Sequence, residues 1–185
     1  MGLDFDKEIE RILKEKKEKN PKELYEIHRI RKKEDELITM ELIKVGFKVS
    51  SLFDLINYKT TDIGFINLLI AYLDSDKISD PIIKDGIIRA ITVKKAKGLV
   101  EEKLLDYYNS LELEKELIGW SIGSWFEFLY SDLYFYQIKK IIENKKNGAS
   151  RQMFIMALCK TKEYKLEAEK LLLKLTFDAK LFYTP

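Results

Sequence analysis

Apolar residues along most of this chain recur at intervals of three and four positions, the spacing of one face of an α-helix. Two examples are the series Ile63, Ile66, Ile70, Leu73 and the series Leu171, Leu172, Leu175. The two-residue alternation that is typical of β-strands is weak throughout. Turn and helix-stop residues interrupt the pattern at Asn20-Pro21, Asp80-Pro81, Ala96-Lys97-Gly98 and Asn147-Gly148. The sequence therefore predicts an all-α fold.

The predicted helices repeat along the chain. Small or apolar pairs mark the first helix of each unit, at Leu55-Ile56, Ala90-Ile91, Trp125-Phe126 and Ala157-Leu158. Successive pairs are 35, 35 and 32 residues apart. Each pair is followed by a polar turn and a second apolar helix, at 62–73, 98–109, 133–145 and 163–176. Two helices per unit with a period of about 33 to 35 residues indicate an α-solenoid, whose units bury their apolar faces by stacking.

Four stretches carry a resemblance to a known repeat class: ELIKVGFKVSSLFDLIN (41–57), DGIIRAITVKKAKG (85–98), LIGWSIGSWFEFL (117–129) and NGASRQMFIMALCKTKEYKLEAEKLLLKLTFD (147–178). Over 41–178 the chain resembles the HEAT-repeat class of bacterial α-solenoid proteins. The signatures of tetratricopeptide and ankyrin repeats do not occur in the sequence. The resemblance implies a HEAT-like α-solenoid of about four antiparallel helix pairs, which binds partners through one face.

The domain organisation follows from the length and from a change in composition near residue 40. A chain of 185 residues is long enough for one continuous core, and we expect a single all-α domain. Residues 1–40 are dense in charge, and their thin apolar spacing predicts two amphipathic helices that meet at Asn20-Pro21 and form an N-terminal cap. Residues 41–178 hold the repeats, and 179–185 form a C-terminal tail.

Charge and hydropathy narrow the classes of function. The 33 Lys and Arg residues against 31 Asp and Glu leave a net charge of +2, too balanced to predict nucleic-acid binding from bulk charge. The first residues contain no apolar segment of a secretory signal. The most apolar stretch, 117–131, is interrupted by Glu127 and is too short to span a bilayer. We expect a cytoplasmic protein with no membrane partner.

One stretch spells a catalytic motif. Gly119-Trp120-Ser121-Ile122-Gly123 matches G-x-S-x-G, the nucleophile elbow of serine esterases. A working elbow needs a preceding strand and a later histidine, whereas the flanks have helical spacing and the lone His28 lies upstream. We therefore interpret 117–129 as a helix in which Gly119 and Gly123 share one face and allow a neighbouring helix to approach closely.

Other catalytic and cofactor signals are weak. One histidine and one cysteine are too few for a zinc site, so no metal is predicted. The phosphate-binding and dinucleotide-binding glycine motifs do not occur, so no cofactor is predicted. We expect His28 to be solvated on a helix and Cys159, beside an Ala-Leu pair, to be a buried and inert core thiol in a reducing compartment. A non-enzymatic function follows.

Aromatic residues are concentrated in one short region of the chain. The band consists of Trp120, Trp125, Phe126, Phe128, Tyr130, Tyr134, Phe135 and Tyr136. Either all of it is core, or part of it reaches the surface, where Trp and Tyr are preferred interface anchors. Two tryptophans five positions apart point to different sides of a helix, so at most one lies at the centre of a packed seam. The predicted partner-binding residues are Trp120, Trp125, Tyr134, Arg89 and Arg151, the arginines because they begin two repeat units.

A basic set supplies the alternative function. Lysines fall near predicted helix ends and turns, at Lys94, Lys95, Lys97, Lys139, Lys140, Lys145 and Lys146. Their simplest role is to complement helix dipoles. The alternative is a basic concave groove that binds nucleic acid, as HEAT-like alkylpurine DNA glycosylases bind DNA, although their catalytic residues have no counterpart here. The primary hypothesis is a protein-binding module: an adaptor, a regulator or an immunity-type inhibitor.

Overall fold

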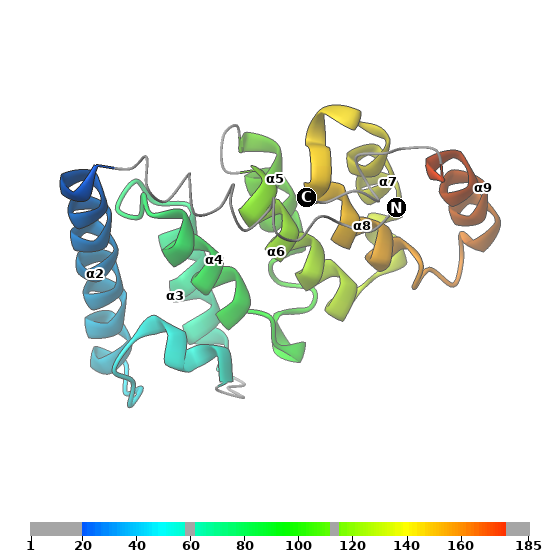
Figure 1. Ribbon diagram of the computed structural model, residues 1–185. Helices are drawn as coiled ribbons and strands as arrows, with labels where there is room; N and C mark the ends of the chain where they lie inside the picture. Colours follow the sequence, from blue (N-terminus) through cyan, green and yellow to red (C-terminus); the bar gives the residue numbers. More distant parts are fainter. Residues whose placement is uncertain (1–19, 58–61, 112–114, 177–185) are drawn as a thin grey trace.

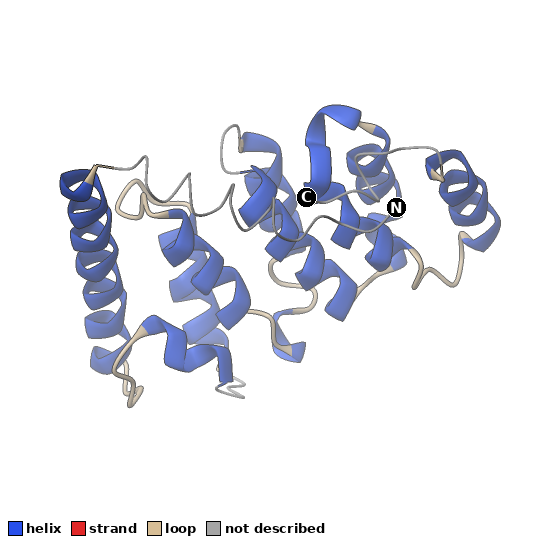
Figure 2. Cartoon of the chain, viewed as in Figure 1, coloured by secondary structure: helices blue, strands red, loops and turns tan. Residues whose placement is uncertain are grey.

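The architecture was determined from a computed structural model that describes residues 20–57, 62–111 and 115–176. Within these residues the α-helices are α2 (Pro21–Lys44), α3 (Ile63–Leu73), α4 (Pro81–Ala90), α5 (Glu101–Ser110), α6 (Lys115–Leu129), α7 (Phe135–Glu143), α8 (Arg151–Leu158) and α9 (Lys165–Leu175). Short 3-10 helices are η1 (Leu52–Asn57), η2 (Lys94–Ala96), η3 (Asp132–Tyr134) and η4 (Lys145–Ser150). The described residues contain no strand (Figure 2), which confirms the predicted all-α class.

The helices follow one another along the length of the molecule. Figure 1 shows α2 at one end and α9 at the other, with the remaining helices between them. Helix α6 is central, because it packs against α4, α5, α8 and η4. The first predicted helix, within residues 1–19, and the C-terminal tail lie outside the described residues.

Several helices begin where the sequence predicts. Asn20 caps α2 by accepting a hydrogen bond from Lys22 N at 3.1 Å, and Pro21 follows it. Asp80 caps α4 by accepting from Ile82 N at 2.8 Å, again with proline next. A side-chain acceptor followed by proline starts a helix because it satisfies a free N–H and fixes the first φ angle.

The first helix of the first unit, which Leu55-Ile56 was expected to mark, is in the structure only the short 3-10 helix η1. Helix α2 continues past residue 40 to Lys44, so the expected boundary of the cap lies inside a helix. It ends in a Schellman motif, in which Gly46 has φ +96° and Phe47 N donates to Leu42 O at 2.9 Å. The chain then reverses and Asp35 of α2 accepts hydrogen bonds from Ser51 Oγ and Leu52 N, which starts η1 in place of an α-helix.

The G-x-S-x-G stretch lies inside α6, and the described residues contain no strand that could precede a nucleophile elbow. A Cβ at Gly119 would lie 2.7 Å from Tyr108 Cε2 and 2.8 Å from Ser150 Cβ. A Cβ at Gly123 would lie 2.7 Å from Met153 Cβ. All three distances are far shorter than van der Waals contact, so the expected close approach at these two glycines is confirmed. Because the stretch lies within a helix, it does not form a nucleophile elbow.

Ser121 between these glycines joins α6 to α4. Its hydroxyl is buried and donates a short hydrogen bond to Asp85 Oδ1, and Asp85 also pairs with Arg89 at 2.8 Å. Trp125 adds a second link, since its indole Nε1 donates to Ile91 O at 3.2 Å, at the C-terminal end of α4. Polar groups that are buried at this contact are therefore satisfied across it.

Gly123→Ala tests the close packing of α6 on α8. The added methyl meets Met153 Cβ and, at 3.0 Å, Phe154 N, so α8 must shift as a unit. We expect a loss of about 1–3 kcal/mol in the free energy of unfolding, measured by denaturant titration. Gly64→Ala is the control, because the exposed Gly64 faces only Asp62 Oδ1 at 3.1 Å and should change stability by less than about 0.5 kcal/mol. Equal effects at both positions would contradict this packing.

Ser121→Ala tests the link between α6 and α4. The substitution leaves Asp85 Oδ1 buried without its donor, so we expect a loss of about 1.5–3 kcal/mol, the range for a hydrogen bond to a charged group. Ser124→Ala on the exposed side of the same helix serves as the control, because its hydroxyl bonds only to Trp120 O within α6. If Ser121→Ala unfolds at the same denaturant concentration as the wild type, the hydrogen bond has no structural role.

Candidate functional site

The structure separates the two tryptophans of the aromatic band. Trp125 is fully buried and packs edge-to-face against Phe126, with ring centroids 5.1 Å apart. Trp120 is 42% exposed, so one tryptophan lies in the core and the other on the surface, as their spacing indicated. Tyr134 is buried, with its ring 6.1 Å from Phe126. Trp125 and Tyr134 therefore belong to the interior and do not form part of a surface that contacts a partner.

The two predicted arginines also differ. Arg151 is fully buried and donates hydrogen bonds from Nε to Gly148 O at 2.9 Å and from Nη1 to Ile142 O at 3.2 Å. It closes the end of α7, so its role is structural, because guanidinium donors satisfy carbonyls that a helix end leaves free. Arg89 is exposed on α4 beside Asp85. Of the five predicted residues, the structure brings Trp120 and Arg89 together on the surface.

Helix α6 presents an exposed apolar face. At about 100° per residue, its outward positions fall within an arc of roughly 100°. They are Leu117, Trp120, Ser124, Glu127 and Phe128, whereas the other described side chains of the helix are buried. The large apolar members, Leu117, Trp120 and Phe128, are 44%, 42% and 53% exposed. The outward face of a central helix is ordinarily polar, so this stripe is a candidate binding surface.

A small hollow adjoins Trp120, and we call it the Trp120 hollow. It has a volume of about 290 Å³. The described residues that line it are Ile56, Arg89, Thr92, Trp120, Ser121 and Ser124. They come from η1, from the end of α4 and from α6, so three separate segments meet here. The hollow combines an indole face with one guanidinium group.

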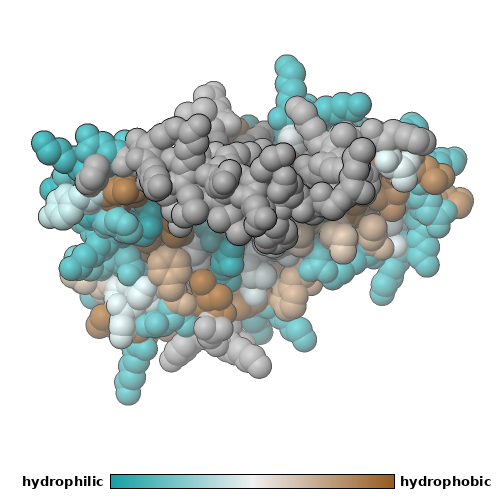
Figure 3. Space-filling view, in the orientation of Figure 1, coloured by the Kyte–Doolittle hydropathy of each residue, from teal (hydrophilic) through white to brown (hydrophobic). Residues whose placement is uncertain are grey.

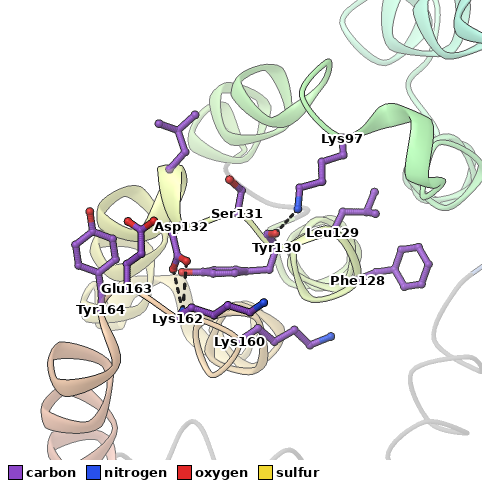
Figure 4. Close-up of a pocket in the computed structure, with 11 residues that line it drawn as sticks. Lys97, Phe128, Leu129, Tyr130, Ser131, Asp132, Lys160, Lys162, Glu163 and Tyr164 are labelled. Atoms are coloured by element: carbon purple, nitrogen blue, oxygen red, sulfur yellow. Dashed lines mark hydrogen bonds between the residues drawn. The ribbon is translucent and has the colours of Figure 1, made fainter.

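A larger and more open groove, the Tyr130 groove, lies at the C-terminal end of α6 and has a volume of about 770 Å³. Its described lining is Lys97, Phe128, Leu129, Tyr130, Ser131, Asp132, Leu133, Lys160, Lys162, Glu163 and Tyr164. Figure 4 shows Lys97 reaching toward Tyr130 from one side and Lys160 and Lys162 on the other, while Phe128 projects away from Tyr130. Phe128 thus connects the groove with the exposed face of α6.

Three charged side chains of the Tyr130 groove, those of Lys97, Lys160 and Asp132, are engaged in structural contacts. Lys97 Nζ donates to Tyr130 O at 2.7 Å, and Lys160 Nζ lies 2.5 Å from Glu127 Oε1. Burial alone would raise the pKa of Asp132, but hydrogen bonds from Thr161 and from Lys162 N lower this pKa on balance. The carboxylate therefore stays ionised at neutral pH and holds the 161–162 turn.

Tyr130 is the most perturbed acid of this groove. Burial raises the pKa of Tyr130 to about 12, against an ordinary value of 10.0. The phenol therefore stays protonated near neutral pH and does not act there as a base.

The seven lysines of the alternative hypothesis lie in two separate places. Lys94 and Lys95 belong to η2, at the lower edge of Figure 1, whereas Lys145 and Lys146 belong to η4, at its upper edge. On α7, Lys140 is exposed and Lys139 pairs with Glu167 at 3.6 Å. The set does not line one groove. The structure instead gathers Lys97 with Lys160 and Lys162.

Other predicted features can be placed as well. Cys159 is exposed, which corrects the expected core thiol: it follows α8 as the C-cap, one position past the buried Leu158. His28 is exposed on α2, as expected. Among the residues that the structure describes, no group of three His, Cys, Asp or Glu side chains is placed to hold a metal ion. None of the described helices is both long and apolar enough to cross a membrane.

Sequence analysis missed part of the exposed face. Leu117, Ser124 and Phe128 follow Trp120 at helical spacing, so the pattern within 117–129 contained enough information to find them. Lys160 and Lys162 had no such signal, because they reach Phe128 only through the folding of α8 against α6. Figure 3 shows apolar surface on one side of the molecule as separate patches among hydrophilic residues.

Comparison of the chain with protein-family models, with curated proteins and with solved structures found no match.

Proposed function

We propose that this chain is a HEAT-like α-solenoid that binds a protein partner, without catalysis, through the exposed face of α6. The observation that carries the proposal is the stripe of Leu117, Trp120 and Phe128 on that face, beside Arg89. Tryptophan and arginine are the residue types that most often dominate binding energy at protein interfaces. An adaptor, a regulator or an immunity-type inhibitor would use such a face in the same way.

Contacts between neighbouring units support the solenoid. Trp125 bonds to Ile91 O across 34 positions, Lys97 to Tyr130 O across 33, and Ser121 to Asp85 across 36. Two of these separations fall within the period of about 33 to 35 residues that the sequence indicates and the third exceeds it by one; in a solenoid each unit contacts the next. The order of the helices along the molecule in Figure 1 agrees with this arrangement.

The balance of polar and apolar groups supports a protein partner. The inward side of α6 packs against its neighbours through the two glycines and Trp125. The exposed stripe on the other side is therefore not needed to stabilise the core. Leaving three large apolar side chains in water has a cost that binding removes, at roughly 25 cal/mol per Å² of buried apolar area. Ser124 and Glu127 beside them provide the polar margin that interfaces have around an apolar centre.

Trp120→Ala tests the proposed face. Ligands are first selected from a display library of short random peptides with the full chain as the immobilised target. For ligands that bind this face, we expect Trp120→Ala to weaken binding by about 2 kcal/mol or more, roughly thirtyfold, as measured by fluorescence anisotropy. The substituted side chain is partly exposed, so the variant should unfold at nearly the wild-type denaturant concentration.

The matched control is Leu166→Ala. Leu166 is a strongly exposed leucine on α9, at the end of the molecule, so its loss should leave peptide affinity unchanged. The proposed function fails if no selected peptide depends on Trp120, or if both substitutions weaken binding equally.

A gel-shift experiment separates this function from the nucleic-acid alternative. With a formal net charge of +2 and basic residues on two edges of the molecule, we expect no retention of DNA or RNA at low salt. A nucleic-acid-binding groove would instead retain both and would lose affinity steeply as salt rises, because each phosphate contact releases counterions. Such retention would favour the alternative.

A further inference from the structure

The Trp120 hollow has few hydrogen-bond donors left for a ligand. Its three hydroxyl groups all donate internally: Thr92 Oγ1 to Ile88 O at 2.8 Å, Ser124 Oγ to Trp120 O at 3.0 Å, and Ser121 Oγ to Asp85. The side chains that can still donate are the guanidinium of Arg89 and the indole N–H of Trp120. A ligand for this hollow therefore needs an apolar body and an acceptor.

Arg89 is held in place while part of it remains available. Its Nε lies 2.8 Å from Asp85 Oδ2, and Asp85 is fixed in turn by Ser121. Within the part of the chain that the structure describes, this ion pair is the one charged contact of Arg89, and about half of its side chain is exposed. A guanidinium carries five N–H donors in a rigid fork, so its terminal nitrogens can still bind a carboxylate through two parallel hydrogen bonds.

We propose that the partner presents a short peptide segment with an apolar side chain in the Trp120 hollow and a neighbouring carboxylate on Arg89. This inference rests on the proposed function and adds the chemistry of the partner. Charge complementarity carries it, because Arg89 is the charged group among the described residues that line the hollow. Asp85 and Ser121 are positioning residues, which hold the guanidinium and reduce the entropy lost when the carboxylate binds.

Two of the three lysines of the Tyr130 groove are less suited to this role. Lys97 is bound to a backbone carbonyl and Lys160 to Glu127, so each would have to break a contact to receive a new carboxylate. Arg89 needs no such rearrangement, because its pair with Asp85 involves Nε. Arg89, unlike these lysines and Lys162, lines the Trp120 hollow, so the proposal places the acidic group of the partner there.

The test uses the peptide selection described above and reads the composition of the selected peptides. With the wild-type chain we expect Asp, Glu or a free C-terminus close to an apolar residue. With Arg89→Glu as the target, the acidic preference should disappear and Lys or Arg should replace it. Arg29→Glu is the matched control, because Arg29 is an exposed helix arginine paired with Glu26 on α2, at the far end of the molecule from α9 and away from α6. Its selection should match the wild type.

A double-mutant cycle isolates the contact between Arg89 and the carboxylate of the peptide from the separate effects of each change. Replacing the carboxylate of a selected peptide by its amide should weaken binding to the wild-type chain by about tenfold or more. The same replacement should have almost no effect on binding to Arg89→Gln. Arg89→Lys should restore only part of the loss, because an ammonium group lacks the planar fork.

The outcomes separate the two proposals. Peptides that depend on Trp120 but bind equally well as acid or amide would overturn the present inference and leave the proposed function standing. A selection that gives no Trp120-dependent peptide would overturn both.

Discussion

The close approach of α6 to its neighbours at Gly119 and Gly123 is the constraint on which the centre of this structure depends. A single Cβ at either position would overlap with buried groups of α5, η4 or α8. On another side of the same helix, Ser121 donates a hydrogen bond to Asp85 of α4 and Trp125 donates one to Ile91 O. The same approach fixes the rotation of α6 about its axis. Its remaining arc, with Leu117, Trp120 and Phe128, must then face outward.

Buried polar side chains in this protein serve the ends of neighbouring helices. Glu34 of α2 accepts hydrogen bonds from Ser79 N at 2.9 Å and Asp80 N at 3.0 Å, just before α4 begins. Arg151 satisfies Ile142 O at the end of α7 in the same way. Short helices have many such ends, each with free N–H or C=O groups, and burying them unpaired is costly. Glu34 and Arg151 therefore have structural contacts in the interior, and the candidate site lies among more exposed residues.

Helix α6 thus has two roles on two faces. Its small residues and Trp125 join it to the core, and its outward stripe forms the proposed binding surface. Arg89 connects the two roles, because the ion pair that orients its guanidinium involves Asp85, the same carboxylate that Ser121 holds from α6. A stretch that resembles a catalytic motif is in this structure a packing element, and it positions the proposed binding face.

The sequence by itself determined what depends on neighbours along the chain. Helical spacing predicted the all-α class, turn residues at Asn20-Pro21 and Asp80-Pro81 predicted the breaks that precede α2 and α4, and the spacing of two tryptophans predicted that they separate. It did not predict the turn after Gly46. This turn depends on the hydrogen bonds that Ser51 and Leu52 donate to Asp35, which lies on the preceding helix α2.

Tertiary structure alone decided the surface. Arg89 and Arg151 were both expected to begin repeat units, yet Arg89 lies in the last turn of α4, exposed beside Trp120, and Arg151 begins α8 and is enclosed at the end of α7. Likewise, the seven lysines that look like one set in the sequence are divided among η2 and the residue after it, α7 and η4. Local spacing indicates which face of a helix is apolar. The exposure of a side chain and the clustering of charges depend on which helices pack together, and this packing involves residues that are distant in the chain.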